Sequence, residues 1–286
     1  MDGDNGAGAP TSGAWEITGN TRLLAVIGSP VAHSLSPLIH NRFARALGLP
    51  YVYVAFEVTP GTLGGFIEAA RALNMAGFNV TMPLKRLLLP YLTAPPGARA
   101  PGGAVNTVTL RGGELYGVST DGDGFLLSLD LLGLDAGDGG ALVLGAGGAA
   151  RAVAAALRGR GVYTRVAARR PEEFPAEYAD ERLPWSEIAR AADSAALVVN
   201  ATPLGMSETN ARFDGFGFLD SMRRGGSVYD LVYSPRKTRL LREAEARGLR
   251  AVNGIAMLVG QAALSFEIFT GVRPPDALVA EVIGLQ

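Results

Sequence analysis

The sequence contains no cysteine and only two histidines, His33 and His40, among its 286 residues. Without thiols the chain forms no disulfide, has no thiolate nucleophile and offers no sulfur ligand to zinc. Two histidines are also too few for a histidine-rich metal site, so we expect no bound metal. Any chemistry must come from lysine, carboxylate, hydroxyl and amide side chains.

Long hydrophobic runs and an excess of charge of one sign are also missing. Apolar residues make up 48% of the chain, but they occur in short runs broken by glycine and proline, not in the roughly 20 consecutive apolar residues of a membrane span. A formal net charge of -1 gives no global attraction to nucleic acid or to an anionic membrane. We therefore expect a small-molecule partner.

The first 20 residues have neither the basic start nor the apolar centre of a secretory signal peptide. They are rich in glycine and small polar residues, which predicts a flexible tail over residues 1–20. We expect the rest to form a cytoplasmic protein. The sequence leaves a monomer and a homodimer equally open.

From Leu23 onward, β-type runs alternate with helical patterns, which is typical of an α/β fold with largely parallel sheets. The first half predicts strands at 23–28, 51–58 and 76–81, followed by a β-hairpin made of AVNTVTL and ELYGVST. A helical pattern starts at SPLIHN, with Ser36 expected as its N-cap and Pro37 as its first helical residue.

The second half opens with ALVLGAGGAARAV, residues 141–153, a strand, a tight glycine turn and a helix. Such a turn lets a pyrophosphate rest on the N–H groups at the helix N-terminus. Further strand patterns at 162–168, 195–201, 226–233 and 250–253 complete a predicted five-stranded nucleotide-binding sheet. Two helical patterns then end the chain and could pack on either half.

The loop after the second strand of this sheet bears on the choice of cofactor. NAD-binding units place an acidic residue there, which binds the ribose hydroxyls. This chain has AARRPEE, so Arg169 and Arg170 stand at that position and match a 2′-phosphate by bidentate hydrogen bonds. The pattern favours NADP over NAD, with a ribose contact from Glu172 or Glu173 as the alternative.

A second dehydrogenase pattern is rejected. Tyr233 and Lys237 have the YxxxK spacing of short-chain dehydrogenases, in which both residues project from one helix. Pro235 lies between them and would break that helix. We interpret the match as accidental.

Polar clusters in the first half fall at the ends of predicted strands, where open α/β sheets bind ligands. They offer neutral donors and acceptors suited to a polyhydroxylated substrate: Ser34, Ser36, Asn79, Thr81, Asn106 and Thr120. Pro83 suits a helix start, which would place Lys85 in a first turn, where the helix dipole favours loss of its proton. This predicts Lys85 as a general acid or base oriented by Asp121. The alternative is a solvated Lys85 beside Arg86, with Asp121 as an ordinary N-cap.

Taken in order, these segments resemble the shikimate dehydrogenase family. The likeness covers nearly the whole chain after the tail, through GSPVAHSLSPLIHN, NVTMPLK, GAVNTV, STDGDG, GAGGAARAV, NATPLGM, DLVYSP and GIAMLVGQ. That family reduces 3-dehydroshikimate to shikimate with NADPH on the route to aromatic amino acids. The resemblance implies two α/β domains: a substrate domain of residues 21–121 and 256–286, to which the C-terminal helices return, and a Rossmann-like NADP domain of residues 122–255.

The resemblance also implies roles for single residues. Lys85 and Asp121 would form the catalytic pair. Substrate contacts would come from Ser34, Ser36 and Tyr233 at the carboxylate, and from Thr81, Asn106, Asp121 and Gln261 at the ring hydroxyls. Cofactor contacts would come from Gly145, Ala146, Gly147, Gly148, Ala149, Arg169, Arg170, Thr202, Met206 and Gly254.

The chain departs from the family pattern at two places. Ser119 stands where the family often has asparagine, and Ala168-Arg169-Arg170 replaces a common Asn-Arg-Thr. The first change could alter a hydrogen bond near the substrate, and the second bears on the preference for the cofactor. Three rival functions remain: a quinate or dual quinate/shikimate dehydrogenase using NAD or NADP, a methylene-tetrahydrofolate dehydrogenase, and a non-catalytic metabolite sensor. SLSP together with STDG disfavours the folate enzyme, and the presence of both Lys85 and Asp121 disfavours the sensor.

Overall fold

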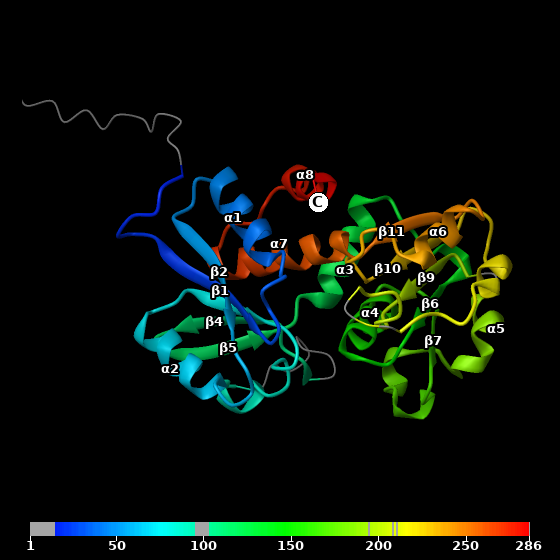
Figure 1. Ribbon diagram of the computed structural model, residues 1–286, viewed down its shortest axis with the longest axis horizontal. Helices are drawn as coiled ribbons and strands as arrows, with labels where there is room; N and C mark the ends of the chain where they lie inside the picture. The colour runs from blue at the N-terminus through cyan, green and yellow to red at the C-terminus, as the bar shows by residue number, and fades with distance from the viewer. Residues whose placement is uncertain (1–14, 95–102, 194, 208, 210, 286) are drawn as a thin grey trace, which may run out of the picture.

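The computed structural model describes residues 15–94, 103–193, 195–207, 209 and 211–285. Two β-sheets lie side by side, and the helices α3 and α7 run between them (Figure 1). The predicted tail lies mostly outside the described residues. Within its described part, the ring of Trp15 lies 4.7 Å from the guanidinium carbon of Arg45 on the first helix.

The first sheet has five strands in the order β2-β1-β3-β4-β5. Its strands are β1 (Arg22–Gly28), β2 (Tyr51–Glu57), β3 (Gly77–Val80), β4 (Thr107–Arg111) and β5 (Glu114–Val118). The first three pair in parallel through α1 (Ser36–Ala46) and α2 (Leu63–Ala72). The last two strands are antiparallel, so the predicted hairpin is confirmed.

The second sheet has six strands in the order β11-β10-β9-β6-β7-β8, and neighbouring strands pair in parallel. Its elements are β6 (Ala141–Leu144), α4 (Gly148–Gly159), β7 (Thr164–Ala168), β8 (Glu181–Pro184), α5 (Ile188–Ala192), β9 (Leu197–Asn200), β10 (Ser227–Asp230), α6 (Arg239–Glu245) and β11 (Arg250–Asn253). The prediction of five strands is wrong because it missed β8. Its sequence, ERLP, has no run of apolar residues, and it lies at the sheet edge, where polar residues and proline are tolerated.

Two predicted helix starts are also wrong. The helix α1 begins at Ser36 itself and its N-cap is Leu35, whose side chain cannot cap; the Ser34 hydroxyl accepts the Ser36 N–H at 3.3 Å. After β3, residues 82–88 form consecutive turns and end in a 3-10 turn, Leu89–Tyr91. Within residues 82–88 one hydrogen bond of the α-helical type forms, from the Leu88 N–H to the Leu84 carbonyl at 3.1 Å, which makes a single turn and not a helix. No helix dipole therefore acts on Lys85.

Two helices connect the sheets and cross backbone to backbone: α3 (Asp121–Leu131) and α7 (Ile255–Thr270). A methyl group on Gly124 of α3 would collide with the backbone of Gln261 on α7. A methyl group on Gly260 would in turn collide with the carbonyl oxygen of Gly124. Only glycine at both positions allows the two helices to approach this closely.

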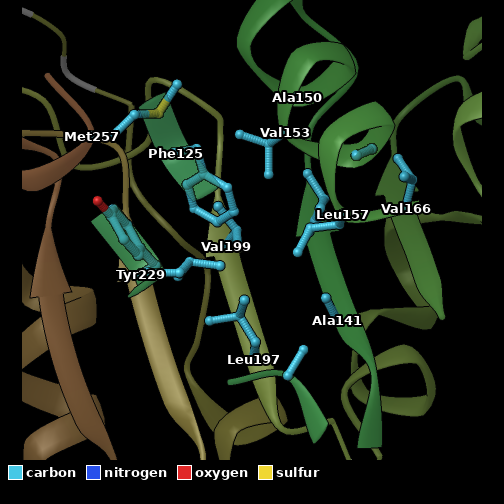
Figure 2. Packing of buried hydrophobic residues seen from close by; sticks show 14 of the residues in the cluster. Phe125, Ala141, Ala150, Val153, Leu157, Val166, Leu197, Val199, Tyr229 and Met257 are labelled. Atoms are coloured by element: carbon cyan, nitrogen blue, oxygen red, sulfur yellow. The ribbon is translucent and has the colours of Figure 1, made fainter. Parts of the chain in front are cut away.

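Each sheet packs into two hydrophobic clusters, and α3 contributes to one of the two on each sheet; the cluster that it joins on the first sheet is called the first core. Phe125 of α3 and Met257 of α7 pack beside Tyr229 and Val199 of the second sheet (Figure 2). The opposite side of α3 adds Leu127 and Leu131 to the core of the first sheet. The last helix, α8 (Asp276–Leu285), also packs on the first core, so both C-terminal helices return to the N-terminal half.

Among the described helices, none combines the length and the apolar character needed to cross a bilayer. Within the described ranges, no three side chains of the metal-binding types His, Cys, Asp and Glu gather as a metal site requires.

His40 of α1 is buried in the first core among aromatic rings. Its ring is parallel to that of Tyr53 on β2, with the centroids 4.1 Å apart and the planes 7° from parallel. Neither ring nitrogen has a hydrogen-bond partner among the described residues. Burial lowers the pKa of His40 to about 3, so the ring is neutral at ordinary pH.

The variant Gly124→Ala is expected to lower the free energy of unfolding by about 3 kcal/mol, because the added methyl group forces α3 and α7 apart. Gly65→Ala is the matched control: this exposed glycine of α2 has no heavy atom within 4 Å of an added methyl group. It should gain about 0.5 kcal/mol from the better helix former. Urea unfolding measures both changes, and wild-type stability of Gly124→Ala would contradict the close crossing.

Burial of His40 also predicts a loss of stability in acid. The unfolded chain protonates this ring near pH 6.5 and the folded chain only near pH 3, so between these values the unfolded state binds more protons. The free energy of unfolding therefore falls as the pH falls through this window, by about 2 kcal/mol at about pH 5. His40→Phe should remove this part of the pH dependence in urea unfolding, and a variant of the exposed His33, His33→Gln, should retain it. An unchanged pH dependence in His40→Phe would count against the assignment.

Candidate active site

Lys85 and Asp121 form an ion pair between the two sheets. The Lys85 Nζ lies 2.6 Å from Asp121 Oδ2, and the side chains are 27% and 13% exposed. Lys85 comes from the turns after β3, and Asp121 is the first residue of α3, where the helix dipole stabilises a carboxylate. The lysine is the more exposed partner, so its side chain remains partly accessible.

Asn106 orients the carboxylate of this pair. Its Nδ2 donates to Asp121 Oδ1 at 2.7 Å and lies 3.2 Å from Gln261 Oε1 on α7. Its own Oδ1 accepts the backbone N–H of Thr120 at 2.9 Å. Four residues predicted from separate motifs, Lys85, Asn106, Asp121 and Gln261, are thus brought together by these contacts.

A buried polar cluster continues behind Asn106. Asn79, on β3, donates from Nδ2 to Thr107 Oγ1 and to Ser265 Oγ, both at 3.0 Å. Tyr53 on β2 donates its hydroxyl proton to Asn79 Oδ1 at 2.7 Å. The sequence reasoning did not select Tyr53, Thr107 or Ser265, although Thr107 directly follows Asn106 in the AVNTV motif.

The remaining predicted substrate contacts lie on neighbouring loops. Ser34 and Ser36 follow β1, and Thr81 follows β3, which pairs with β1, so these loops leave the same edge of the sheet. Thr81 donates its N–H to the carbonyl of Ile27 at 2.9 Å and joins the two strand ends. Tyr233, which follows β10 of the second sheet, packs against the first core and so crosses between the sheets.

The glycine turn after β6 leaves room for a phosphate. Gly145 has φ +113°, and a methyl group there would lie 3.0 Å from the Thr202 side chain and 3.1 Å from the Ala201 carbonyl oxygen. Gly147 is the N-cap of α4, and methyl groups on Gly147 and Gly148 would meet no heavy atom within 4 Å. The start of α4, including Ala146 and Ala149 of the same turn, thus offers N–H groups to an anion. This geometry fits the pyrophosphate of a dinucleotide.

The two arginines after β7 are not equivalent. Arg170 pairs with Glu173, with 2.6 Å between Nη1 and Oε1. Arg169 is exposed and forms no ion pair with the described residues. Arg151, which the sequence reasoning missed because it reads as an ordinary helix residue, donates to the carbonyls of Ala146 and Glu173 at 3.2 and 3.4 Å. It therefore ties the glycine turn to the arginine loop.

Hydrogen bonds also connect the loops after β9 and β10. The Thr202 hydroxyl donates to Asn200 Oδ1 at 2.6 Å, and Asn200 Nδ2 donates to Asp230 Oδ1 at 2.8 Å. Burial raises the pKa of Asp230, while hydrogen bonds from Thr238, Val232 and Asn200 oppose the rise. These bonds fix the NATPLGM loop, which carries Met206, beside the DLVYSP loop.

Two further predictions concern the segment after β10. A methyl group on Gly254, the N-cap of α7, would collide with the carbonyl oxygen of Leu231, so this residue allows a close backbone approach. Residues 234–237 are not helical, and Lys237 pairs with Glu245 at 2.6 Å. The rejection of the YxxxK pattern is therefore confirmed.

Comparisons with known proteins agree with this geometry. Residues 26–108 match the model of the shikimate dehydrogenase substrate binding domain, and residues 254–283 match the shikimate 5'-dehydrogenase C-terminal domain. A shikimate dehydrogenase (NADP(+)) of Geobacter metallireducens is 42% identical over 279 residues, which cover 92% of this chain and 96% of that protein.

Solved structures show the same likeness. The shikimate 5-dehydrogenase of Thermus thermophilus in complex with NADP(H) and shikimate aligns with a TM-score of 0.79 and 38% identity, covering 93% of this chain and 99% of that chain. A quinate dehydrogenase of Corynebacterium glutamicum in complex with NAD aligns with a TM-score of 0.78 at 29% identity, covering 93% and 99%. With 42% identity across 92% of its length to a curated member, the chain belongs to the shikimate dehydrogenase family.

Proposed function

We propose that the protein catalyses the reversible, NADP-dependent reduction of 3-dehydroshikimate to shikimate in aromatic amino acid biosynthesis. The observation that carries this proposal is the ion pair between Lys85 and Asp121, placed between the two sheets and oriented by Asn106. This pair supplies an acid and a partner carboxylate without sulfur or metal ligands. The family membership and the phosphate-sized space at the start of α4 agree with it.

When bound, NADPH supplies the hydride for the substrate carbonyl carbon. The protonated Lys85 then gives its proton to the carbonyl oxygen, so the ketone becomes a hydroxyl group and the lysine becomes neutral. Asp121 keeps the ammonium group in position, and Asn106 keeps the carboxylate in position. In the reverse direction, the neutral Lys85 accepts the hydroxyl proton. A positioned acid of this kind contributes about a hundredfold to ten-thousandfold in rate.

We assign the other residues by their place around this pair. Ser34, Ser36 and Tyr233 bind the substrate carboxylate, and Thr81 and Gln261 bind its ring hydroxyls together with Asn106 and Asp121. The pyrophosphate rests on the glycine turn, Gly145 to Ala149, and Arg169 faces the 2′-phosphate. Thr202, Met206 and Gly254 lie at the nicotinamide. The neutral donors around the pair suit a polyhydroxylated ring.

Substrate and cofactor are bound by different halves of the chain, each built around one of the two sheets. Residues 21–121 with 256–286 bind the substrate, and residues 122–255 bind NADP. Each sheet has its own hydrophobic clusters, and α3 begins at Asp121 and joins the two halves. We infer that the enzyme acts in the cytoplasm as a monomer or a homodimer.

Oxidation of shikimate by the purified protein tests the proposal. We expect rapid reduction of NADP, followed by absorbance, and little turnover of quinate or NAD. Lys85→Ala should lower kcat by at least about a hundredfold because the proton acceptor is lost. Arg86→Ala removes the exposed neighbouring cation and is the matched control, with wild-type activity expected.

Each other result of this assay selects a rival. Turnover of quinate with NAD would identify a dual-specificity enzyme, in agreement with the structural likeness to a quinate dehydrogenase. Failure of all pairs of substrate and cofactor would reject the enzyme and favour a metabolite sensor. Full activity in Lys85→Ala would remove Lys85 from the mechanism.

The arginine loop generates a prediction about the cofactor. Arg169→Ala should raise the KM for NADP by about tenfold and leave the KM for NAD unchanged, because a charge-assisted bond to the 2′-phosphate is lost. Arg170→Ala, the neighbouring control, should have a much smaller effect because Glu173 already pairs with this side chain. Initial rates at varied NADP and NAD measure both. A larger effect from Arg170 than from Arg169 would reverse the assignment.

A further inference from the structure

Tyr53 lies at the far end of the buried cluster that leads to Asp121. Its hydroxyl donates to Asn79 Oδ1 at 2.7 Å. The two amide protons of Asn79 are shared among three acceptors, the backbone carbonyl of Asn106 at 2.9 Å and the hydroxyls of Thr107 and Ser265, both at 3.0 Å. Every one of these residues is buried. A chain of direct hydrogen bonds therefore connects β2 to the residue that orients the catalytic carboxylate.

The Thr107 hydroxyl links Asn79 to Asn106. Its oxygen accepts from Asn79 Nδ2, and its proton is donated to Asn106 Oδ1 at 2.8 Å when Ser265, whose Oγ lies 2.7 Å from Thr107 Oγ1, acts as a donor to Thr107. Because donors occupy the Asn106 side-chain oxygen, the Nδ2 group of the same amide faces Asp121 and donates to Oδ1. Were the amide reversed, an oxygen would face the carboxylate and repel it. The orientation of Asn106 thus depends on two donors to its oxygen, the Thr107 hydroxyl and the Thr120 backbone N–H.

The Tyr53 side chain is held in place for this contact from several directions. Its ring stacks on His40, and its backbone N–H and C=O both bond the side-chain amide of Asn41 at 2.8 Å. Burial raises the pKa of Tyr53 well above its ordinary value, and the Ser36 hydroxyl opposes part of the rise. The phenol therefore stays protonated at neutral pH and acts as a donor.

We propose that Tyr53 is a positioning residue for the acid–base pair: its hydroxyl fixes Asn79, and through Thr107 it keeps the Asn106 amide directed at Asp121. Tyr53 touches neither Lys85 nor Asp121 among the described contacts, so its effect on this pair passes through Asn79 and Thr107. The inference rests on the proposed function, which makes Lys85 and Asp121 the reacting pair.

Tyr53→Phe tests the proposal because phenylalanine keeps the stack on His40 and removes only the hydroxyl. We expect kcat for shikimate oxidation to fall about tenfold, as for a small misplacement of reacting groups, with the KM for NADP unchanged. Tyr51→Phe is the matched control. Its hydroxyl lies on the same strand and, among the described residues, accepts a hydrogen bond from Arg22 at 3.3 Å and contacts no member of the buried cluster, so kcat should not change.

A double-mutant cycle separates positioning from a general loss of stability. Thr107→Val removes the next hydroxyl in the chain at nearly constant shape and should also lower kcat about tenfold. If Tyr53 acts through Thr107, the double variant should fall about tenfold as well, not a hundredfold. Independent, multiplied effects, or wild-type kcat in Tyr53→Phe, would overturn the proposal.

A second measurement does not depend on activity. In the ¹⁵N-labelled full-length protein, the side-chain amide protons of Asn106 should exchange with solvent at least about tenfold faster in Tyr53→Phe than in wild type or Tyr51→Phe. Unchanged exchange would overturn the proposal even where kcat falls. If the wild-type protein failed to oxidise shikimate, the proposed function would be rejected, and the exchange rates would still decide whether Tyr53 orients Asn106.

Discussion

The close crossing of α3 and α7 is the contact on which the rest of the structure depends. Gly124 and Gly260 allow the two backbones to touch, and this places Gln261 of α7 beside the first turn of α3, where Asp121 lies. Asn106 can then reach both side chains at once. Because α3 also packs into one hydrophobic cluster of each sheet, one helix pair sets the position of the sheets and that of the reacting groups.

Buried polar side chains of the first sheet and its helices are of two kinds: those with hydrogen-bond partners and one, His40, without a partner among the described residues. In the cluster around Asn79 and Asn106, donors meet acceptors, and a fully satisfied network of this kind is rigid and specific. His40 is buried nearby with neither nitrogen bonded to a described residue. An uncharged imidazole is tolerated there as a flat surface for Tyr53, but its protonation is penalised. The precision of the site and the sensitivity of the fold to acid thus arise in neighbouring side chains.

Most strands and the candidate acid–base pair could be predicted from short stretches of the sequence. Alternating apolar runs identified most strands, and the motifs selected Lys85 and Asp121, which the structure brings to 2.6 Å. It missed β8, whose residues carry no apolar pattern, and it placed a helix after Pro83 where turns form. Ser265 was missed for a different reason. Its hydrogen bond to Asn79 joins residues 186 positions apart, and only the folded structure, in which α7 packs on the first sheet, brings them together.

The loop after β7 shows why the sequence alone does not identify which charged side chain is available to bind a phosphate. Arg169 and Arg170 looked equivalent as ligands of a phosphate, and Glu172 and Glu173 looked like rivals that could bind a ribose. In the folded loop Glu173 forms an ion pair with Arg170. Of the two arginines, Arg169 is the one that forms no ion pair with a described residue. The preference for a phosphate therefore depends on which arginine has no acidic partner in the folded loop. Backbone geometry decides this, and here the hydrogen bonds of Arg151 to the glycine turn and to the arginine loop fix that geometry.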